Sequence, residues 1–361
     1  MNAEERKALA ASTGKAVEEI TTTVEDTSRI GRQRVRRALG SLGSLGTAPM
    51  DLIDTHQSGV YALVRGATRA TAALAGDLAH RTAPDDAESA VASPRWAPHV
   101  AAASAAFGDR LDPALTTSMG LRAHGSPIDV ADLSSADTLM VFVHGLGATE
   151  LQWSPEYLDL GPHVLVRYNS GRPIADNGAD LARLLEDVVV ATGAQRLVLV
   201  GHSMGGLVAR SAIAQAQDSQ WVPLVSDLVT LGSPHAGAPL ERFAARSLAM
   251  GQRLRSAEPI IRLGQRRSQG IKDLRFGAMS PGDWHGEIDT EFIDNTAVID
   301  LPGHMRHHAV IAVLAPVVGD GMVTPSSAYH RGARSSVVRG DHLSLLAHDE
   351  VTGLLREVLT A

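Results

Sequence analysis

Apolar segments that alternate with helical segments from about residue 118 onward limit the possible folds of this chain most strongly. The segments TLMVFVHG (138–145), HVLVRY (163–168) and RLVLVG (196–201) contain few polar residues. Strands that are apolar on both faces are typical of parallel sheets covered by helices on each side. Residues 118–130 predict an early strand and turn. Further strands are predicted at 228–233, 308–318 and 335–338, and helices at 175–193, after residue 203 and at 348–359.

Three regions follow from this pattern. Residues 1–81 predict an N-terminal helical arm, because apolar residues recur at helical spacing after Pro49. Residues 82–118, which contain Pro84, Pro94 and Pro98, predict a linker with a short helical segment. Residues 119–361 predict an α/β domain with a mostly parallel central sheet and helices on both faces. Its alternation of strands and helices lapses over 236–306, which we interpret as a lid or cap insertion.

Composition excludes several classes of protein. The 361 residues include no cysteine, which excludes disulfide scaffolds and thiolate metal sites. A net charge of −7 and only 4% aromatic residues argue against a nucleic-acid partner. The N-terminus lacks the apolar core of a secretory signal, and the apolar stretch 309–318 is too short to span a bilayer, so a cytoplasmic protein is expected.

An arginine-rich segment in the arm leaves two interpretations open. Residues 29–39 carry five arginines among Ile30, Val35 and Leu39. This pattern indicates either a solvated helix face or a basic amphipathic segment that lies on an anionic membrane or lipid surface.

Residues 198–210, VLVGHSMGGLVAR, place a serine at a tight corner between a strand and a helix. Gly201-His202-Ser203-Met204-Gly205 is a G-x-S-x-G pattern in the context that a nucleophile elbow requires. The turn strains the backbone of Ser203, so that Gly201 and Gly205 are needed beside it. We therefore predict Ser203 as a nucleophile.

A serine hydroxyl needs a neighbouring base, and in such a fold an acid and a histidine follow the serine on loops after late strands. Asp320, in APVVGDGMV, and His342, in VVRGDHLSLLAH, occupy these places. We predict Asp320 as the acid and His342 as the base. The alternatives are less well placed: His348 in the last helix, His304, His307 and His308 before the penultimate strand, Asp341 in a turn, and Asp294 and Asp300 in or near the insertion.

An oxyanion formed at Ser203 would need two N–H donors. The backbone N–H of Met204 directly follows the nucleophile, and the loop after the early strand 138–145 supplies the other donor. His144-Gly145 turns the chain there, which leaves the N–H of Leu146 as the best candidate. His144 is interpreted as a residue that orients this loop.

These motifs resemble the α/β-hydrolase superfamily. They are most similar to bacterial true lipases and to the lipase-like domain of glycosylphosphatidylinositol inositol-deacylases. The resemblance covers 119–361 and depends on FVHGLG, GHSMGG, LGSPHAG, GDGMV and GDHLSLL. It implies oxyanion donors at Leu146 and Met204, an acid at Asp320, a base at His342, and a structural His235. The arm has no counterpart in secreted lipases, and the insertion has few bulky apolar residues, which argues against a preference for triglyceride droplets.

The sequence therefore predicts a serine carboxylic-ester hydrolase that acts on a small-molecule or lipid ester and uses no metal or organic cofactor. Acyl transfer and thioesterase activity proceed through the same intermediate and stay open. The alternative from another class is a non-catalytic protein that docks on lipid or membrane through its arm.

Overall fold

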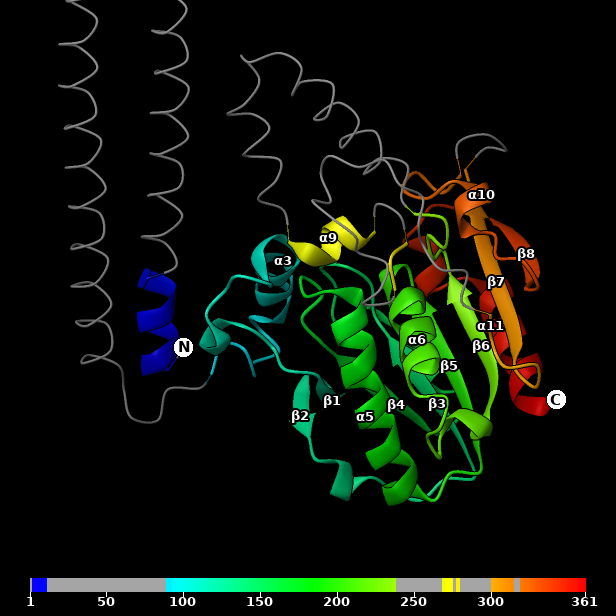
Figure 1. Cartoon of the computed structure of the whole chain (residues 1–361), viewed down its shortest axis with the longest axis horizontal. Helices are drawn as coiled ribbons and strands as arrows, with labels where there is room; N and C mark the ends of the chain where they lie inside the picture. Colours follow the sequence, from blue (N-terminus) through cyan, green and yellow to red (C-terminus); the bar gives the residue numbers. More distant parts are fainter. Residues whose placement is uncertain (1, 12–88, 238–267, 275–276, 280–299, 315–318) are drawn as a thin grey trace, which may run out of the picture. The chain divides into compact units, whose positions relative to one another are not determined.

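The computed structural model describes residues 2–11, 89–237, 268–274, 277–279, 300–314 and 319–361 (Figure 1). The strands of the described residues form one sheet in the order β2-β1-β4-β3-β5-β6-β7-β8. From β4 to β8 all neighbours are parallel. The strands are β1 Gly120–Ala123, β2 Ser126–Ile128, β3 Thr138–Val143, β4 His163–Arg167, β5 Arg196–His202, β6 Val225–Leu231, β7 Arg306–Val313 and β8 Arg334–Arg339. The predicted mostly parallel α/β sheet is confirmed.

The predicted early strand and turn are a two-stranded hairpin at one edge of the sheet. β1 and β2 pair antiparallel, and β1 also pairs antiparallel with β4. The two residues between the strands, His124 and Gly125, both have positive φ, at 51° and 84°. Positive φ at both residues is the requirement of a type I′ turn, whose twist matches that of the flanking strands.

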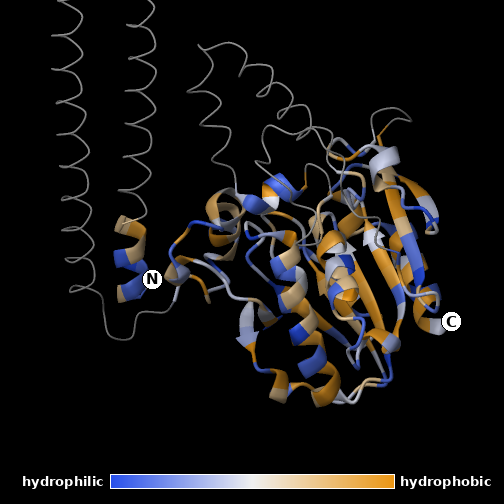
Figure 2. Cartoon of the chain, in the orientation of Figure 1, coloured by the Kyte–Doolittle hydropathy of each residue, from blue (hydrophilic) through white to orange (hydrophobic). Residues whose placement is uncertain are grey.

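Helices cover both faces of the parallel strands, as the apolar strands predict. α5 (Ile174–Thr192) and α6 (Met204–Gln215) lie on one face, whereas α11 (Asp349–Thr360) and the short α4 (Pro155–Leu158) lie on the other (Figure 1). The strands between them are predominantly hydrophobic, and α5 is polar on its outer side (Figure 2).

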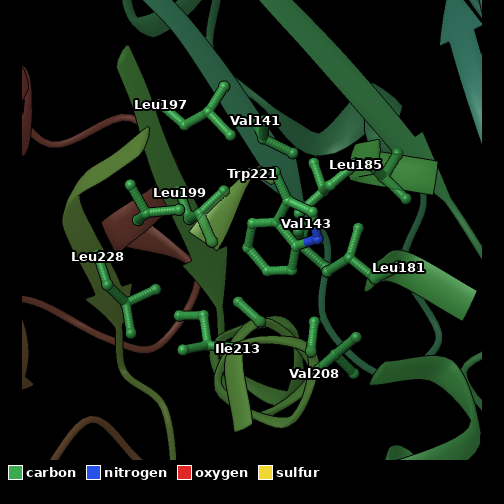
Figure 3. Packing of buried hydrophobic residues seen from close by; sticks show 14 of the residues in the cluster. Val141, Val143, Leu181, Leu185, Leu197, Leu199, Val208, Ile213, Trp221 and Leu228 are labelled. Atoms are coloured by element: carbon green, nitrogen blue, oxygen red, sulfur yellow. The ribbon is translucent and has the colours of Figure 1, made fainter. Parts of the chain in front are cut away.

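The face under α5 and α6 holds the larger apolar cluster. Trp221 is fully buried there and packs with Val143 of β3 and with Leu181 and Leu185 of α5 (Figure 3). Burying one such leucine contributes about 1.5–3 kcal/mol. α5 ends at Thr192 and is capped by Gly193, whose φ of 67° lets its N–H bond the Val189 carbonyl and close the last turn.

Shorter elements surround the sheet. α9 (Gln269–Asp273), within the predicted insertion, contacts α3 (Ala97–Phe107), which lies within the predicted linker. The hydroxyl of Ser268 donates to the Ala105 carbonyl, and the Asp273 carboxylate accepts from the N–H of Ile174 at the start of α5, at 2.6 Å. Other short helices of the unit that contains the sheet are α10 Pro325–Ala328 and the 3₁₀ turns Val130–Asp132, Glu150–Gln152, Val222–Leu224 and Ser344–Leu346. In the N-terminal unit, residues 3–11 are helical and Pro113–Leu115 is a 3₁₀ turn.

The predicted region boundaries remain a prediction. Most of the 1–81 arm, its arginine-rich segment, and much of the 236–306 insertion lie outside the described residues. Within the N-terminal unit, the Glu5 carboxylate accepts from the backbone N–H of Ala90 at 2.8 Å. In the part of the chain that the structure describes, no helix combines the length and the apolar character that a membrane crossing needs.

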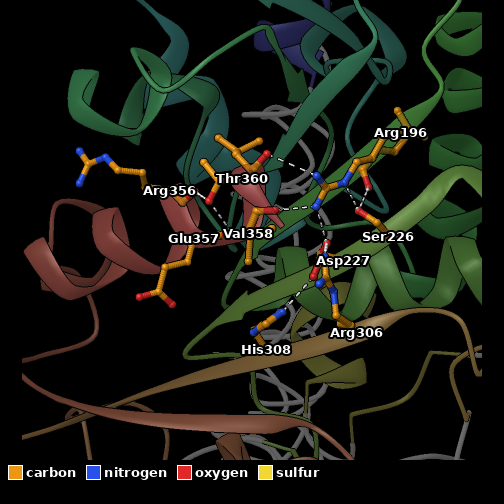
Figure 4. Close-up of polar contacts among 11 residues, drawn as sticks. Arg196, Ser226, Asp227, Arg306, His308, Arg356, Glu357, Val358 and Thr360 are labelled. Atoms are coloured by element: carbon orange, nitrogen blue, oxygen red, sulfur yellow. Dashed lines mark hydrogen bonds and ion pairs between the residues drawn. The ribbon is translucent and has the colours of Figure 1, made fainter.

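A buried carboxylate joins the amino ends of the parallel strands to the end of α11 (Figure 4). Asp227 of β6 is fully buried and accepts from Arg196 at 3.1 Å, from Arg306 at 2.7 Å and from His308 at 3.0 Å. Arg196 also donates to the Val358 carbonyl of α11 at 2.5 Å. Burial raises the pKa of Asp227, but these hydrogen bonds outweigh it and hold the pKa below its usual range. The network lies at the strand ends away from Ser203, so its role is structural.

One sequence prediction was wrong here. β7 begins at Arg306, two residues before the predicted start at 308, so His307 and His308 lie inside the strand and not before it. His308 fits within a strand because its imidazole bonds Asp227 on the neighbouring strand, a partner that the sequence does not reveal.

Candidate active site

Ser203 occupies the corner between β5 and α6 with φ 52° and ψ −122°. It is one of two residues other than glycine with positive φ among those described. A side chain at Gly201 would place its Cβ 2.5 Å from the backbone of Gly206, and one at Gly205 would place it 2.1 Å from the Val143 carbonyl oxygen. Both distances are too short for a Cβ atom, so no residue other than glycine fits at either position. The two glycines of the pattern are therefore required by the packing of the turn, and the strained serine is what a nucleophile elbow needs.

His342 and Asp320 form a buried pair. The Nδ1 atom of His342 lies 2.6 Å from Oδ2 of Asp320. A carboxylate only accepts, so Nδ1 carries the proton and the lone pair of Nε2 is available as a base. Burial by itself would raise the pKa of Asp320. Hydrogen bonds from His342 and from the backbone of Val323 and Met322 lower this pKa by more than burial raises it, so the pKa lies below its usual value.

The end of β6 brings this pair to the elbow. The N–H of Ser203 donates to the Leu231 carbonyl at 2.8 Å. The next residue, Gly232, lies so close to the pair that a Cβ there would be 3.1 Å from Nδ1 of His342 and 3.2 Å from Oδ2 of Asp320. All three predicted residues thus meet at the carboxyl edge of the sheet, where ligands bind in open α/β sheets.

The loop after β3 lies against the elbow. A Cβ on Gly145 would be 3.2 Å from Cβ of Ser203 and 3.1 Å from Nδ1 of His202. Leu146, the predicted oxyanion donor, directly follows this point of contact in the chain. Met204 is the first residue of α6, and its N–H belongs to the group of donors at a helix start that has no partner within the helix.

His144 is buried and holds this loop. Its Nδ1 lies 2.8 Å from the Gly145 carbonyl oxygen, and its Nε2 lies 3.3 Å from the backbone nitrogen of Tyr168. Burial lowers the pKa of His144 to about 4. A neutral imidazole between these partners fits the predicted role in orienting the loop.

His202, within the elbow, contacts the loop that carries His342. Its Nε2 lies 3.0 Å from the His342 carbonyl oxygen, and the two rings lie 4.8 Å apart between centroids. Burial, followed by the nearby His342, lowers the pKa of His202 to about 3. His202 is thereby kept neutral beside the imidazole of His342.

The alternative residues have other tasks. Asp341, next to His342, accepts from the N–H groups of Leu343 and Ser344 at 3.0 and 2.8 Å, which is the turn predicted for it. His348 is the N-cap of α11 and accepts from the Glu350 N–H at 3.2 Å, so it begins the helix and does not lie inside it. His304 contacts the Val222 carbonyl oxygen.

The strand order, with the antiparallel hairpin at one edge and a strained serine between β5 and α6, is that of the α/β-hydrolase fold. A family model for the PGAP1-like alpha/beta domain matches residues 185–274 of the chain, from within α5 through β5, the elbow and β6 to the end of α9.

Two curated relatives match part of the chain. A triacylglycerol lipase of Burkholderia plantarii is 33% identical over 144 residues, which is 36% of this chain and 39% of the relative. A triacylglycerol lipase of Pseudarthrobacter phenanthrenivorans is 33% identical over 117 residues, which is 29% of this chain and 35% of that protein. The chain thus spans less than two-fifths of the length of these relatives.

Among solved structures, the chain is similar to the mature lipase BlEst2 of Bacillus licheniformis. The TM-score is 0.44 at 21% identity, with 61% of this chain and 91% of that chain covered. It is also similar to the carboxylesterase CesB of Bacillus subtilis, with a TM-score of 0.36 at 17% identity and coverage of 63% and 85%.

A histidine cluster lies beside the site on the α6 face. The rings of His235, His307 and His330 lie 5.0–5.3 Å apart between centroids. Arg210 donates to Nδ1 of His235 at 3.2 Å, so Nε2 of His235 carries the proton that faces Thr230. His307 contacts the same threonine hydroxyl at 2.9 Å. This buried network agrees with the structural role predicted for His235.

We expect the histidine cluster to make the folded protein less stable in acid. Burial, with the charges of His330 and Arg210 and the neighbouring His308, lowers the pKa of His307 to about 3. The unfolded chain takes up this proton near pH 6.5, so stability is complete above that pH and falls as pH decreases toward 3. Replacing His307 by glutamine should lower the slope of the free energy of unfolding against pH, between pH 6 and 4.5, by about 1.4 kcal/mol per pH unit.

Urea unfolding at several pH values measures this slope. His99→Gln, at an exposed site on α3, is the control for loss of a histidine. An unchanged slope in His307→Gln would contradict the assignment.

Sequence reasoning missed residues at the end of β4. Arg167, Tyr168 and Ser170 each bond the loop that follows β3. The available signal was their position at the carboxyl end of an apolar strand, where functional residues gather in such sheets.

Proposed function

We propose that this protein is a serine carboxylic-ester hydrolase, an esterase or lipase, that works through an acyl-enzyme on Ser203. The observation that carries the proposal is the 2.6 Å bond between His342 and Asp320, held at the same sheet edge as the strained Ser203. The two relatives named triacylglycerol lipase support an ester substrate, either a small molecule or a lipid.

In the first half-reaction, Nε2 of His342 accepts the hydroxyl proton while Oγ of Ser203 attacks the ester carbonyl carbon. Asp320 keeps the imidazole in the required tautomer and stabilises the imidazolium. The N–H groups of Leu146 and Met204 bind the oxyanion, and each such donor contributes about 10²–10³ in rate. His342 then gives its proton to the departing alcohol.

In the second half-reaction, water replaces the alcohol. His342 takes a proton from this water, the resulting hydroxide attacks the acyl carbon, and the acid product leaves as Ser203 regains its proton. A thioester could replace the ester as acyl donor in the first half-reaction, and an alcohol could replace water as acceptor in the second, because both routes pass through the same acyl-enzyme. His202, neutral through burial, adds no positive charge against the imidazolium.

Hydrolysis of nitrophenyl esters with acyl chains of graded length tests the proposal, together with labelling by a fluorophosphonate. We expect turnover of at least the short esters and stoichiometric labelling at Ser203. Product analysis with added alcohols separates hydrolysis from acyl transfer. The absence of both turnover and labelling across the series would refute the proposal.

A further inference from the structure

We propose that the end of β4, through Tyr168 and Ser170, holds the loop of residues 144–150 in the conformation that binds the oxyanion. We call these residues the oxyanion loop. Tyr168 and Ser170 are then positioning residues for the reaction, acting through the Leu146 N–H. The inference rests on the proposed function, since it assigns what prepares one of its two oxyanion donors.

The orientation of one peptide group is central. The carbonyl of Gly145 and the N–H of Leu146 belong to the same planar trans peptide and point in opposite directions. His144 binds that carbonyl through Nδ1 at 2.8 Å. By fixing the carbonyl, His144 fixes the direction of the Leu146 N–H.

Tyr168 determines which nitrogen of His144 carries the proton. A backbone N–H can only donate, so the contact of 3.3 Å from Tyr168 N to Nε2 makes Nε2 the acceptor. The proton must then be on Nδ1, where it bonds Gly145. The Tyr168 ring also stacks on the imidazole, with centroids 4.3 Å apart and planes 16° apart.

The side-chain hydroxyl of Tyr168 adds a second bond to the same residue. It donates to the His144 carbonyl oxygen at 2.7 Å, and Tyr168 is 3% exposed. Backbone and side chain of His144 are therefore both bound by one residue of the neighbouring strand.

Two further contacts hold the loop beyond Leu146. The Gly147 N–H donates to the Ser170 hydroxyl at 3.0 Å. The Glu150 carboxylate accepts from Nε of Arg167 at 2.6 Å and from its Nη2, and both side chains are buried. Contacts to residues 144, 147 and 150 thus flank the donor on both sides.

Such restraint matters because an oxyanion hole is effective only when its donors are oriented before charge develops. A neutral hydrogen bond contributes about 1 kcal/mol, or about fivefold in rate, and complete loss of a donor costs about 10²–10³. We expect variants that loosen the oxyanion loop to lower kcat by a factor between these two values.

Tyr168→Phe and Ser170→Ala are the test variants. The first keeps the stacked ring and the backbone N–H and removes only the bond to the His144 carbonyl. The second removes the partner of the Gly147 N–H. Arg167 is left intact, because breaking a buried ion pair costs about 3–5 kcal/mol and would threaten folding.

Thr192→Val is the matched control. It also removes a buried hydroxyl, which donates to the Val188 carbonyl at 2.7 Å, but at the end of α5. We expect kcat on a soluble short nitrophenyl ester to fall five- to hundredfold in each test variant, with KM within twofold. In the control, both parameters should stay at wild-type values.

Hydrogen exchange of residues 144–150 is the second readout, and it does not depend on activity. Exchange should be faster in both test variants, whereas residues 201–206 should exchange as in the wild type. Unchanged exchange, or faster exchange with unchanged kcat, would overturn the inference. A wild type with neither ester turnover nor fluorophosphonate labelling would refute the proposed function, and the exchange data would still decide whether Tyr168 and Ser170 hold the loop.

Discussion

Replacing Ser203 by alanine is expected to lower kcat for ester hydrolysis by about 10⁶-fold, the typical cost of removing the nucleophile of such a triad. No other group can form the acyl-enzyme at this position. The bond between His342 and Asp320 does not involve Ser203 and should persist. Initial rates on a short nitrophenyl ester and labelling by a fluorophosphonate measure the effect.

Ser226→Ala is the control for loss of a serine. Ser226 lies in β6 near the opposite end of the strands, where its hydroxyl accepts from Arg196 at 2.7 Å. This variant should keep both turnover and labelling. Hydrolysis by Ser203→Ala at more than a thousandth of the wild-type rate would show that Ser203 is not the nucleophile.

Replacing Asp320 by asparagine is expected to lower kcat by about 10⁴-fold. Oδ1 of Asp320 accepts from the N–H groups of Met322 and Val323, at 2.8 and 2.6 Å. The oxygen of an asparagine would keep these two bonds, so its NH₂ group would face Nδ1 of His342. An NH₂ group can only donate, so Nδ1 would lose its proton, Nε2 would carry it, and His342 could no longer accept the proton of Ser203.

Asp341→Asn is the matched control, because Asp341 precedes His342 directly. Its amide oxygen can still accept from Leu343 and Ser344, so the turn should persist and kcat should remain within a few-fold of the wild type. Equal losses in the two variants would contradict the assignment of Asp320 as the acid. Melting temperatures of both proteins establish that each one is folded.

The strands were predictable because each is a short apolar run in a mostly parallel sheet. The predicted segments 138–145, 163–168 and 196–201 contain β3, β4 and the first six residues of β5. The start of β7 was not predictable in this way. Arg306 and His307 resemble polar loop residues in the sequence, and they lie in the strand because Asp227 and Thr230 of β6 supply their partners.

The residues of the site also include some that the sequence could predict and some that it could not. Ser203 and its glycines were recognisable because the strain of the turn imposes its own local pattern. Asp320 and His342 were recognisable from their places after late strands. The bonds from Tyr168 and Ser170 were not, since they depend on β4 pairing with β3, which brings two chain segments about 24 residues apart side by side.

By itself, the sequence determined the fold class, the elbow and the candidates for nucleophile, acid and base, because these depend on hydrophobic period, backbone strain and order along the chain. Only the tertiary structure decided which imidazole nitrogen carries each proton and what holds the Leu146 N–H in place. Those properties are set by partners from neighbouring strands, whose identity and distance no local pattern contains.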